Sequence, residues 1–230
     1  MGLRVYAAVL SNASCVTGRM RVLETCRCPA MRVHVFARAP VPGQCKTRLM
    51  PRLGARGAAW VQKRLTEQAL HLACEAVGAT QVTLWGAPDT AHGFFHRCRR
   101  HFGVRLARQP RGDLGRRMRV VLSREPGLLI GSDAFGLQLA DFHRALAALV
   151  AVDHLLLPAT DGGYVLLGSR CALPALAGVH WSSGRECGQT AQRLRRSGLL
   201  QVLGSPRADF DTPADWRRAR RAGLLPALTR

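Results

Sequence analysis

The chain has 230 residues, of which 47% are hydrophobic, and this is enough to bury the core of one ordinary domain. Its 34 Lys and Arg exceed its 14 Asp and Glu by 20 charges, but the apolar runs are short and interrupted by Arg or His, which excludes a membrane-spanning segment. The arginines spread over the whole chain and few aromatic side chains could stack on bases, so nucleic-acid binding is the less favoured interpretation of the charge.

Strand-like and helix-like segments alternate from Met31 onward. A first strand at 33–37 leads into a loop and then into an amphipathic helix at 55–77. In chain order, the sequence then predicts a strand at 81–85, a helix at 90–101, a strand at 104–107, a helix at 114–123, a strand at 127–133, a helix at 138–149, strands at 154–159 and 164–168, a helix at 186–197, a strand at 199–203 and a helix at 213–222. Such alternation predicts an α/β fold with a mainly parallel sheet and helices on both faces.

The first 30 residues stand apart from this pattern. We expect residues 1–30 to be an extension with little stable structure or a mis-assigned start, and residues 31–230 to form one domain. The eight cysteines are dispersed without a Cys-x-x-Cys pair, which is typical of free buried thiols and favours the reducing cytoplasm.

A rigid basic loop follows the first strand. Pro40, Pro42 and Gly43 fix its path, and Lys46 and Arg48 come directly after them. Because a stiff loop loses little entropy on binding, we expect these two cations to bind phosphates, although an ordinary solvated loop is the alternative.

The segment "RGDLGRRM" follows the predicted strand at 104–107. Gly112 and Gly115 permit close backbone approach, and the amide of Gln109 could read a nucleobase. Asp113 could instead simply cap the next helix, so this segment is a weak signal on its own.

Carboxylates follow several predicted strands, where ligands of α/β sheets bind. Asp133, Asp161, Asp209 and Asp211 are four of only 14 acidic residues, and such groups beside cations suit Mg²⁺-assisted chemistry on a diphosphate. Asp209 could merely close a turn, and Asp215 lies where it would complement a helix dipole.

Taken together, "FARAPVPGQCKTRL", "GDLGRRM", "LIGSD", "LLPATDGGYVLLG", "HWSS" and "DFDTPAD" resemble a bacterial family of GT-A-type transferases. This family is known as arsenosugar-biosynthesis glycosyltransferases or radical-SAM/selenodomain-associated transferases, and the resemblance extends from residue 31 to about residue 220. More distantly, the chain is similar to the molybdenum-cofactor and 2-phospholactate guanylyltransferases. The resemblance implies a three-layer, Rossmann-like GT-A fold with a mixed, mostly parallel sheet.

The resemblance also implies roles for particular residues. The family usually has Thr-Asp-Cys-Pro where this chain has Ser132 to Phe135, so the loop beside the metal, and with it the choice of acceptor, would differ. The implied nucleotide site comprises Lys46 and Arg48 at the phosphates and Gln109, Gly112, Asp113 and Gly115 at the base. Asp133 and Asp211 would hold Mg²⁺ or Mn²⁺. The residues that would face the sugar or the acceptor are Asp161, Gly162, Gly163, Tyr164 and Trp181.

These observations lead to one functional expectation. The chain is predicted to be a metal-dependent transferase with a nucleotide-activated donor and a small-molecule acceptor, most simply a glycosyltransferase. Guanylyl or cytidylyl transfer would use the same crevice and is the alternative. The sequence does not indicate which residue would be the catalytic base.

Overall fold

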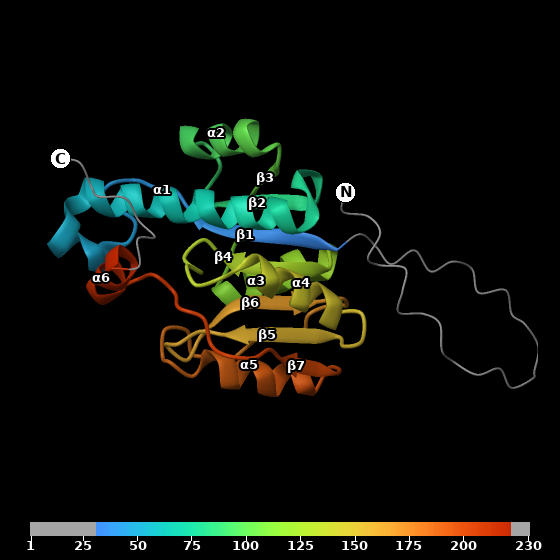
Figure 1. Cartoon of the computed structure of the whole chain (residues 1–230). Helices are drawn as coiled ribbons and strands as arrows, with labels where there is room; N and C mark the ends of the chain where they lie inside the picture. Colours follow the sequence, from blue (N-terminus) through green and yellow to red (C-terminus); the bar gives the residue numbers. More distant parts are fainter. Residues whose placement is uncertain (1–30, 222–230) are drawn as a thin grey trace, which may run out of the picture.

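A seven-stranded sheet in the order β3-β2-β1-β4-β6-β5-β7 forms the middle of the molecule (Figure 1). The structure is a computed structural model that describes residues 31–221, so the expectation for residues 1–30 lies outside the described residues. All neighbouring strands are parallel except β6, which is antiparallel to both β4 and β5. The strands are β1 (Arg32–Arg38), β2 (Val82–Ala87), β3 (Arg105–Arg108), β4 (Gly127–Gly131), β5 (His154–Pro158), β6 (Tyr164–Ser169) and β7 (Leu200–Val202).

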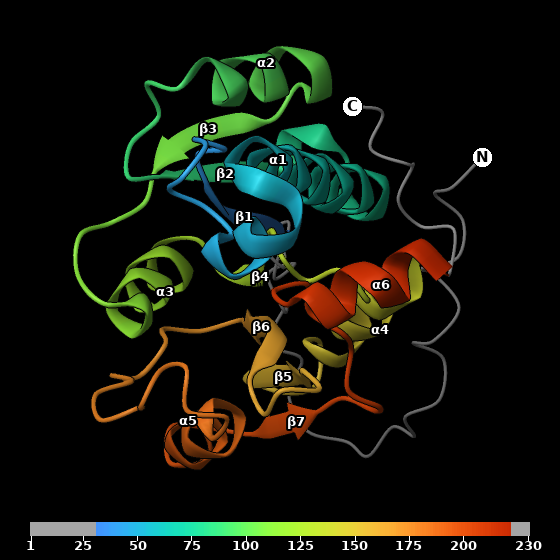
Figure 2. The same ribbon diagram turned by 90° about the vertical axis from the view of Figure 1, so that its left-hand side faces the viewer.

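Helices cover both faces of the sheet (Figure 2). One face packs against α1, α2 and α4, and the other against α3 and α5, while α6 packs on the first half of α1. The prediction of a three-layer, mostly parallel α/β fold is therefore confirmed. The helices are α1 (Met50–Val77), α2 (Gly93–Phe102), α3 (Leu114–Arg124), α4 (Leu139–Ala148), α5 (Glu186–Arg195) and α6 (Pro213–Arg221), with short 3-10 turns η1 (Thr47–Leu49) and η2 (Ala79–Gln81).

The central strands are buried on both sides. Residues 33–37, 127–130 and 154–157 are all buried, which is why they read as continuous apolar runs and not as alternating ones. A core of this kind is expected for strands that lie between two helical layers.

Helix α1 begins earlier than predicted, at Met50 instead of residue 55. Pro51 occupies its first turn, where a missing N–H is harmless, but Gly54 interrupts the helix with φ 66°. This left-handed residue kinks the helix and separates its first turn from the amphipathic part, so the periodic pattern alone did not include that turn.

Strand β4 ends two residues earlier than predicted. Its last residue is Gly131, and Ser132 then donates its N–H to the carbonyl oxygen of Phe36 at 2.9 Å. Asp133 consequently lies on a turn beyond the sheet and not within the strand. None of the helices between residues 31 and 221 is both long enough and apolar enough to cross a membrane.

Candidate functional site

Three segments that are far apart in the sequence meet at the carboxyl edge of the sheet. Figure 2 looks onto this edge, where the segment after β1, the turn after β4 and the segment before α6 lie next to one another. These segments carry Lys46, Asp133 and Asp211, so the structure brings together the loop cation and the two carboxylates that the sequence assigned to a metal.

Lys46 is the centre of this arrangement. Its side chain is only 5% exposed, and its ammonium nitrogen lies 3.6 Å from Asp133 Oδ2 and 3.3 Å from Asp211 Oδ1. It also donates to the carbonyl oxygen of Phe210 at 2.5 Å. Its backbone adopts the left-handed conformation, φ 47°, which a non-glycine residue keeps only where the surroundings hold it. Lys46 therefore holds the two carboxylates together.

Arg48 occupies a more open position. Its Nη1 donates to Asp211 Oδ2 at 2.9 Å, while its side chain is 66% exposed. The remaining guanidinium N–H groups face outward and can meet an anion.

The segment from 203 to 211 carries two of the acidic residues across the edge of the sheet. Phe210 between them is fully buried and faces Trp216 of α6. Backbone hydrogen bonds fix its path: Leu203 N to Leu156 O at 2.8 Å, Arg207 N to Pro158 O at 2.9 Å, Gly136 N to Ala208 O at 2.8 Å and Phe210 N to Asp133 O at 3.0 Å.

A buried ion pair anchors the same segment from beneath. Asp141 on α4 is 1% exposed and accepts two hydrogen bonds from Arg207, Nε at 2.8 Å and Nη2 at 2.7 Å. It also accepts from Arg144 and from the N–H of Gln138. Burial alone would raise the pKa of Asp141, but these hydrogen bonds, led by those of Arg207, lower it. Sequence reasoning did not find this pair.

Asp209 is the acidic residue that sequence reasoning left undecided. Burial raises its pKa to about 6, and the negative charges of Asp161, Asp133 and Asp215 add to the effect. Asp209 therefore lies near enough to Asp133 and Asp161 for their charges to affect its pKa. The signal in the sequence was the Asp-x-Asp spacing around Phe210, which by itself did not indicate the partners.

Asp215, in contrast, has the structural role that the sequence indicated. Its Oδ2 accepts from the N–H groups of Asp211 and Thr212, at 3.1 and 2.7 Å, and so closes the first turn of α6. Burial alone would raise the pKa of Asp215, but the hydrogen bonds from the Thr212 hydroxyl and from these two backbone N–H groups lower it.

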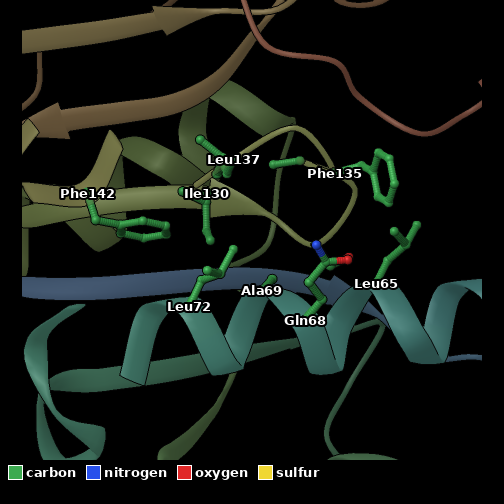
Figure 3. A pocket seen from close by; sticks show the side chains of 10 residues that line it. Leu65, Gln68, Ala69, Leu72, Ile130, Phe135, Leu137 and Phe142 are labelled. Carbon is green, nitrogen blue, oxygen red and sulfur yellow. The ribbon is translucent and has the colours of Figure 1, made fainter. Parts of the chain in front are cut away.

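Phe135 stands where the resembling family has proline. Its ring meets that of Phe210 edge-on at a centroid distance of 5.2 Å. Figure 3 shows Phe135 above Leu65 and Gln68 of α1, in a region packed so tightly that it has no room for a water molecule. Phe135 therefore fastens the turn of Asp133 to α1 and to Phe210 and does not line the open crevice.

Gln109 is tied to the sheet. Its Nε2 donates to the carbonyl oxygens of Trp85, at 3.0 Å, and Ala37, at 3.3 Å, and its Oε1 accepts from Arg117 at 3.4 Å. Reading a base with this amide would require these bonds to be exchanged.

The neighbouring turn also has a structural explanation. Asp113 caps α3 by accepting from the N–H of Arg116 at 2.7 Å. A Cβ on Gly115 would lie 2.9 Å from Cζ2 of Trp181, so this glycine lets the tryptophan pack against the start of α3. The structure thereby places Trp181 next to Gly115.

The turn between β5 and β6 contains the remaining predicted residues. Asp161 accepts from the N–H of Gly163 at 2.9 Å, and Gly162 O accepts from Cys187 N at 3.1 Å. Tyr164 points its hydroxyl inward, 3.7 Å from Met118 Sδ, and burial raises its pKa. Asp161 is exposed and lies near enough to Asp209 for its charge to raise the pKa of that residue, whereas the Tyr164 hydroxyl belongs to the core.

A separate groove of about 780 Å³ lies between α1 and α2. It is cationic, because Arg97 and Arg100 of α2 face Lys63 and Arg64 of α1, with Glu67 as the acidic member. Glu67 pairs with both α1 cations, at 3.8 and 2.9 Å. This groove contains none of the predicted site residues.

The carboxylates do not form a ready-made metal cage. Within residues 31–221, no three His, Cys, Asp or Glu side chains converge closely enough to hold an ion by themselves. The carboxyl edge of the sheet instead offers two carboxylates bridged by a lysine.

The fold has solved relatives of low sequence identity. A protein assigned as a nucleotide-diphospho-sugar transferase from Desulfovibrio desulfuricans G20 is 22% identical with a TM-score of 0.74, and the match covers 88% of this chain and 91% of that one. A cytidylyltransferase from Leptospira borgpetersenii is 10% identical with a TM-score of 0.57, covering 86% and 89%. Rv0371c from Mycobacterium tuberculosis, in complex with manganese, is 19% identical with a TM-score of 0.50, covering 82% and 97%.

The sequence itself places the chain in a family. No curated protein matches it significantly. Residues 69–183, half of the chain, match the family described as "Uncharacterized protein conserved in bacteria (DUF2064)". These residues run from the middle of α1 to the loop of Trp181 and include Gln109, Asp133 and Asp161. The chain therefore belongs to the DUF2064 family.

Proposed function

We propose that the protein is a metal-dependent transferase that acts on a nucleotide-activated donor. The observation that carries this proposal is the convergence of Lys46, Asp133 and Asp211 at the carboxyl edge of the sheet, where ligands of such folds bind. The likeness to a protein assigned as a nucleotide-diphospho-sugar transferase and to a cytidylyltransferase supports the same class of donor.

The residues present fit a hard divalent cation. Mg²⁺ is usually held by one or two carboxylates together with substrate phosphates, so an arrangement of two converging aspartates is the expected protein part. Burial and, to a smaller extent, the negative charges of Asp161 and Asp133 raise the pKa of the nearby Asp209, and Rv0371c was solved with manganese. Asp133 and Asp211 would hold Mg²⁺ or Mn²⁺. Once bound, the ion neutralises charge on the donor's phosphates.

The protein's own cations have distinct roles in this proposal. Lys46 is engaged with Phe210 O and both aspartates, so it positions the carboxylates. Arg48 keeps free N–H groups and would contact the outer phosphate of the donor. Asp161, at the rim, would face the sugar or the acceptor, beside Gly162, Gly163 and Trp181.

Glycosyl transfer is favoured over nucleotidyl transfer because of the resemblance to the arsenosugar-biosynthesis glycosyltransferases. The two reactions differ in their products. Transfer of a sugar from a nucleotide sugar releases the nucleotide, whereas transfer of a nucleotidyl group from a triphosphate releases pyrophosphate. Incubation with each donor and measurement of the released product therefore decides between them.

The test of the site is a thermal-shift screen of nucleoside triphosphates and nucleotide sugars, with and without Mg²⁺ or Mn²⁺. A donor at 100 times its Kd should stabilise the protein by about 2.7 kcal/mol. Asp133→Asn should lose the metal-dependent part of this shift, while Asp161→Asn should keep it and impair transfer to the acceptor.

Glu75→Gln is the matched control, because it removes one exposed carboxylate from α1, away from the crevice. It should behave like the parent. The proposal fails if Asp133→Asn binds donor and metal as the parent does.

A further inference from the structure

A second cluster of polar side chains lies at the opposite edge of the sheet, where β5 begins and β6 ends (Figure 1). His154, the first residue of β5, is fully buried. Its Nδ1 lies 3.0 Å from Ser169 Oγ, and its Nε2 lies 3.0 Å from Ser197 Oγ and 3.8 Å from Cys171 Sγ. Neither the proposed transferase site nor its supporting contacts use these residues.

The hydrogen bonds of the two serines determine how the imidazole is protonated. Ser169 Oγ donates to the carbonyl oxygen of Cys171 at 2.7 Å, and Ser197 Oγ donates to that of Leu194 at 2.9 Å. Each hydroxyl has one proton, so both serine oxygens face His154 as acceptors. The Cys171 thiol is then the proton donor that remains for the ring. A neutral His154 with its proton on Nδ1 donates to Ser169 and turns its Nε2 lone pair toward both Ser197 Oγ and the thiol, so the contact with Ser197 becomes a hydrogen bond only when Nε2 is protonated.

We propose that Cys171 is a nucleophilic thiol that His154 activates, and that it exchanges with low-molecular-weight disulfides. In this exchange the Cys171 thiol proton moves to His154 Nε2 while the sulfur attacks one sulfur of the disulfide. The disulfide bond breaks, a new mixed disulfide forms on Cys171, and the departing thiolate takes the proton from Nε2. No net oxidant or reductant is needed beyond the disulfide itself.

The surroundings suit the base that this step requires. Burial lowers the pKa of His154, although the charge of Asp153 opposes the shift, so the ring is neutral at pH 7 and can accept a proton. Asp153 is itself held by Arg170 at 3.0 Å. Once His154 is protonated, both of its N–H groups can donate to serine oxygens, and these two bonds offset part of the cost that burial places on the cation.

The other described thiols provide internal comparisons. Burial raises the pKa of Cys45, Cys74, Cys98 and Cys187, in each case disfavouring the reactive thiolate. Within residues 31–221, Cys171 is the cysteine that has an imidazole partner, and it is partly exposed.

The experiment treats the full folded chain with glutathione disulfide at pH 7 and follows glutathione addition at each cysteine by peptide mass spectrometry. Cys171 should react faster than Cys45, Cys74, Cys98 and Cys187. His154→Gln should slow its reaction by about 100-fold. His143→Gln is the control, because it removes an exposed histidine from α4 and should change nothing.

The other four described thiols report whether a variant is folded; Cys45 and Cys98 are buried, and Cys74 and Cys187 are partly exposed. If these four thiols become more reactive in His154→Gln, Ser169→Ala tests the proposal instead. Ser169→Ala keeps the base but removes the acceptor that holds the proton on Nδ1. It should also slow the reaction of Cys171 with glutathione disulfide. The proposal is overturned if Cys171 reacts no faster than Cys74 and Cys187, which are partly exposed as Cys171 is. It is equally overturned if a folded variant with a lost or misoriented base reacts as fast as the parent.

Discussion

The buried pair of Asp141 and Arg207 gives the sharpest stability prediction. Arg207→Ala leaves the carboxylate of Asp141, 1% exposed, without its bidentate partner. Breaking a buried ion pair from one side costs about 3–5 kcal/mol. Because Arg144 and the N–H of Gln138 still contact Asp141, we expect the lower end, about 3 kcal/mol, which lowers Tm by about 6–12 °C in a chain of this size.

Arg144→Ala is the matched control. It removes the same charge from the same carboxylate, but the Arg144 side chain is 60% exposed, so its loss should cost less than about 1 kcal/mol. Urea denaturation measures both values. If the two variants lose the same free energy of unfolding, Arg207 is not the partner that compensates the burial of Asp141.

The Asp141–Arg207 pair also makes the stability of the protein depend on pH and affects the proposed donor site. The pKa of Asp141 is lowered in the folded protein, so its stabilising contribution is present above the ordinary Asp pKa, about 3.9, and is lost as the pH falls through the lower folded value. Arg207→Ala should therefore differ most from the parent at neutral pH. Since Arg207 anchors the segment that carries Asp211, the variant should also show a smaller donor-induced thermal shift.

Three further predictions concern other parts of the chain. Asp209→Asn should raise Tm more at pH 8 than at pH 4.5. A carboxyl group whose pKa is raised to about 6 in the folded protein destabilises the fold increasingly as the pH rises from the ordinary Asp pKa, about 3.9, through about 6, so a Tm gain that is the same at both pH values would contradict this. Removal of residues 1–30 should leave Tm and donor binding unchanged, since the strand pattern starts at Met31, and a clear fall in Tm would show that this segment packs on the domain. Binding to DNA or RNA should be weak and steeply salt-dependent. Sequence-specific binding that persists at physiological salt would contradict this and would indicate that the groove lined by Arg97 and Arg100 binds nucleic acid.

The layered fold could be predicted because its signals are local. Continuous apolar runs such as residues 127–130 and 154–157 identify strands that are buried on both faces, and the spacing of Val61, Leu65 and Ala69 identifies α1. Element ends were less well predicted. The end of β4 depends on the bond from Ser132 N to Phe36 O, which joins residues almost a hundred positions apart.

The composition of the crevice could be predicted only in part. The sequence indicated Lys46, Arg48, Asp133 and Asp211 by residue type and position after strands, and the structure brings these four together. It could not indicate that Lys46 bridges the two aspartates, because that contact depends on how the chain after β7 crosses the sheet edge. Arg207, which fixes this crossing, looked like one more arginine in a chain rich in arginine.

In the proposed site, the bridging lysine also limits which ligand can bind. A bare anion would meet the carboxylates of Asp133 and Asp211 next to Arg48, and a bare cation would meet Lys46 between those same carboxylates. A divalent ion bound to a diphosphate presents both signs at once, so that the aspartates can face the ion while Arg48 faces the phosphate. Donor and metal should therefore bind cooperatively, each strengthening the apparent affinity of the other by the same factor. Thermal shifts for the two together that only equal the sum of the separate shifts would argue against this arrangement.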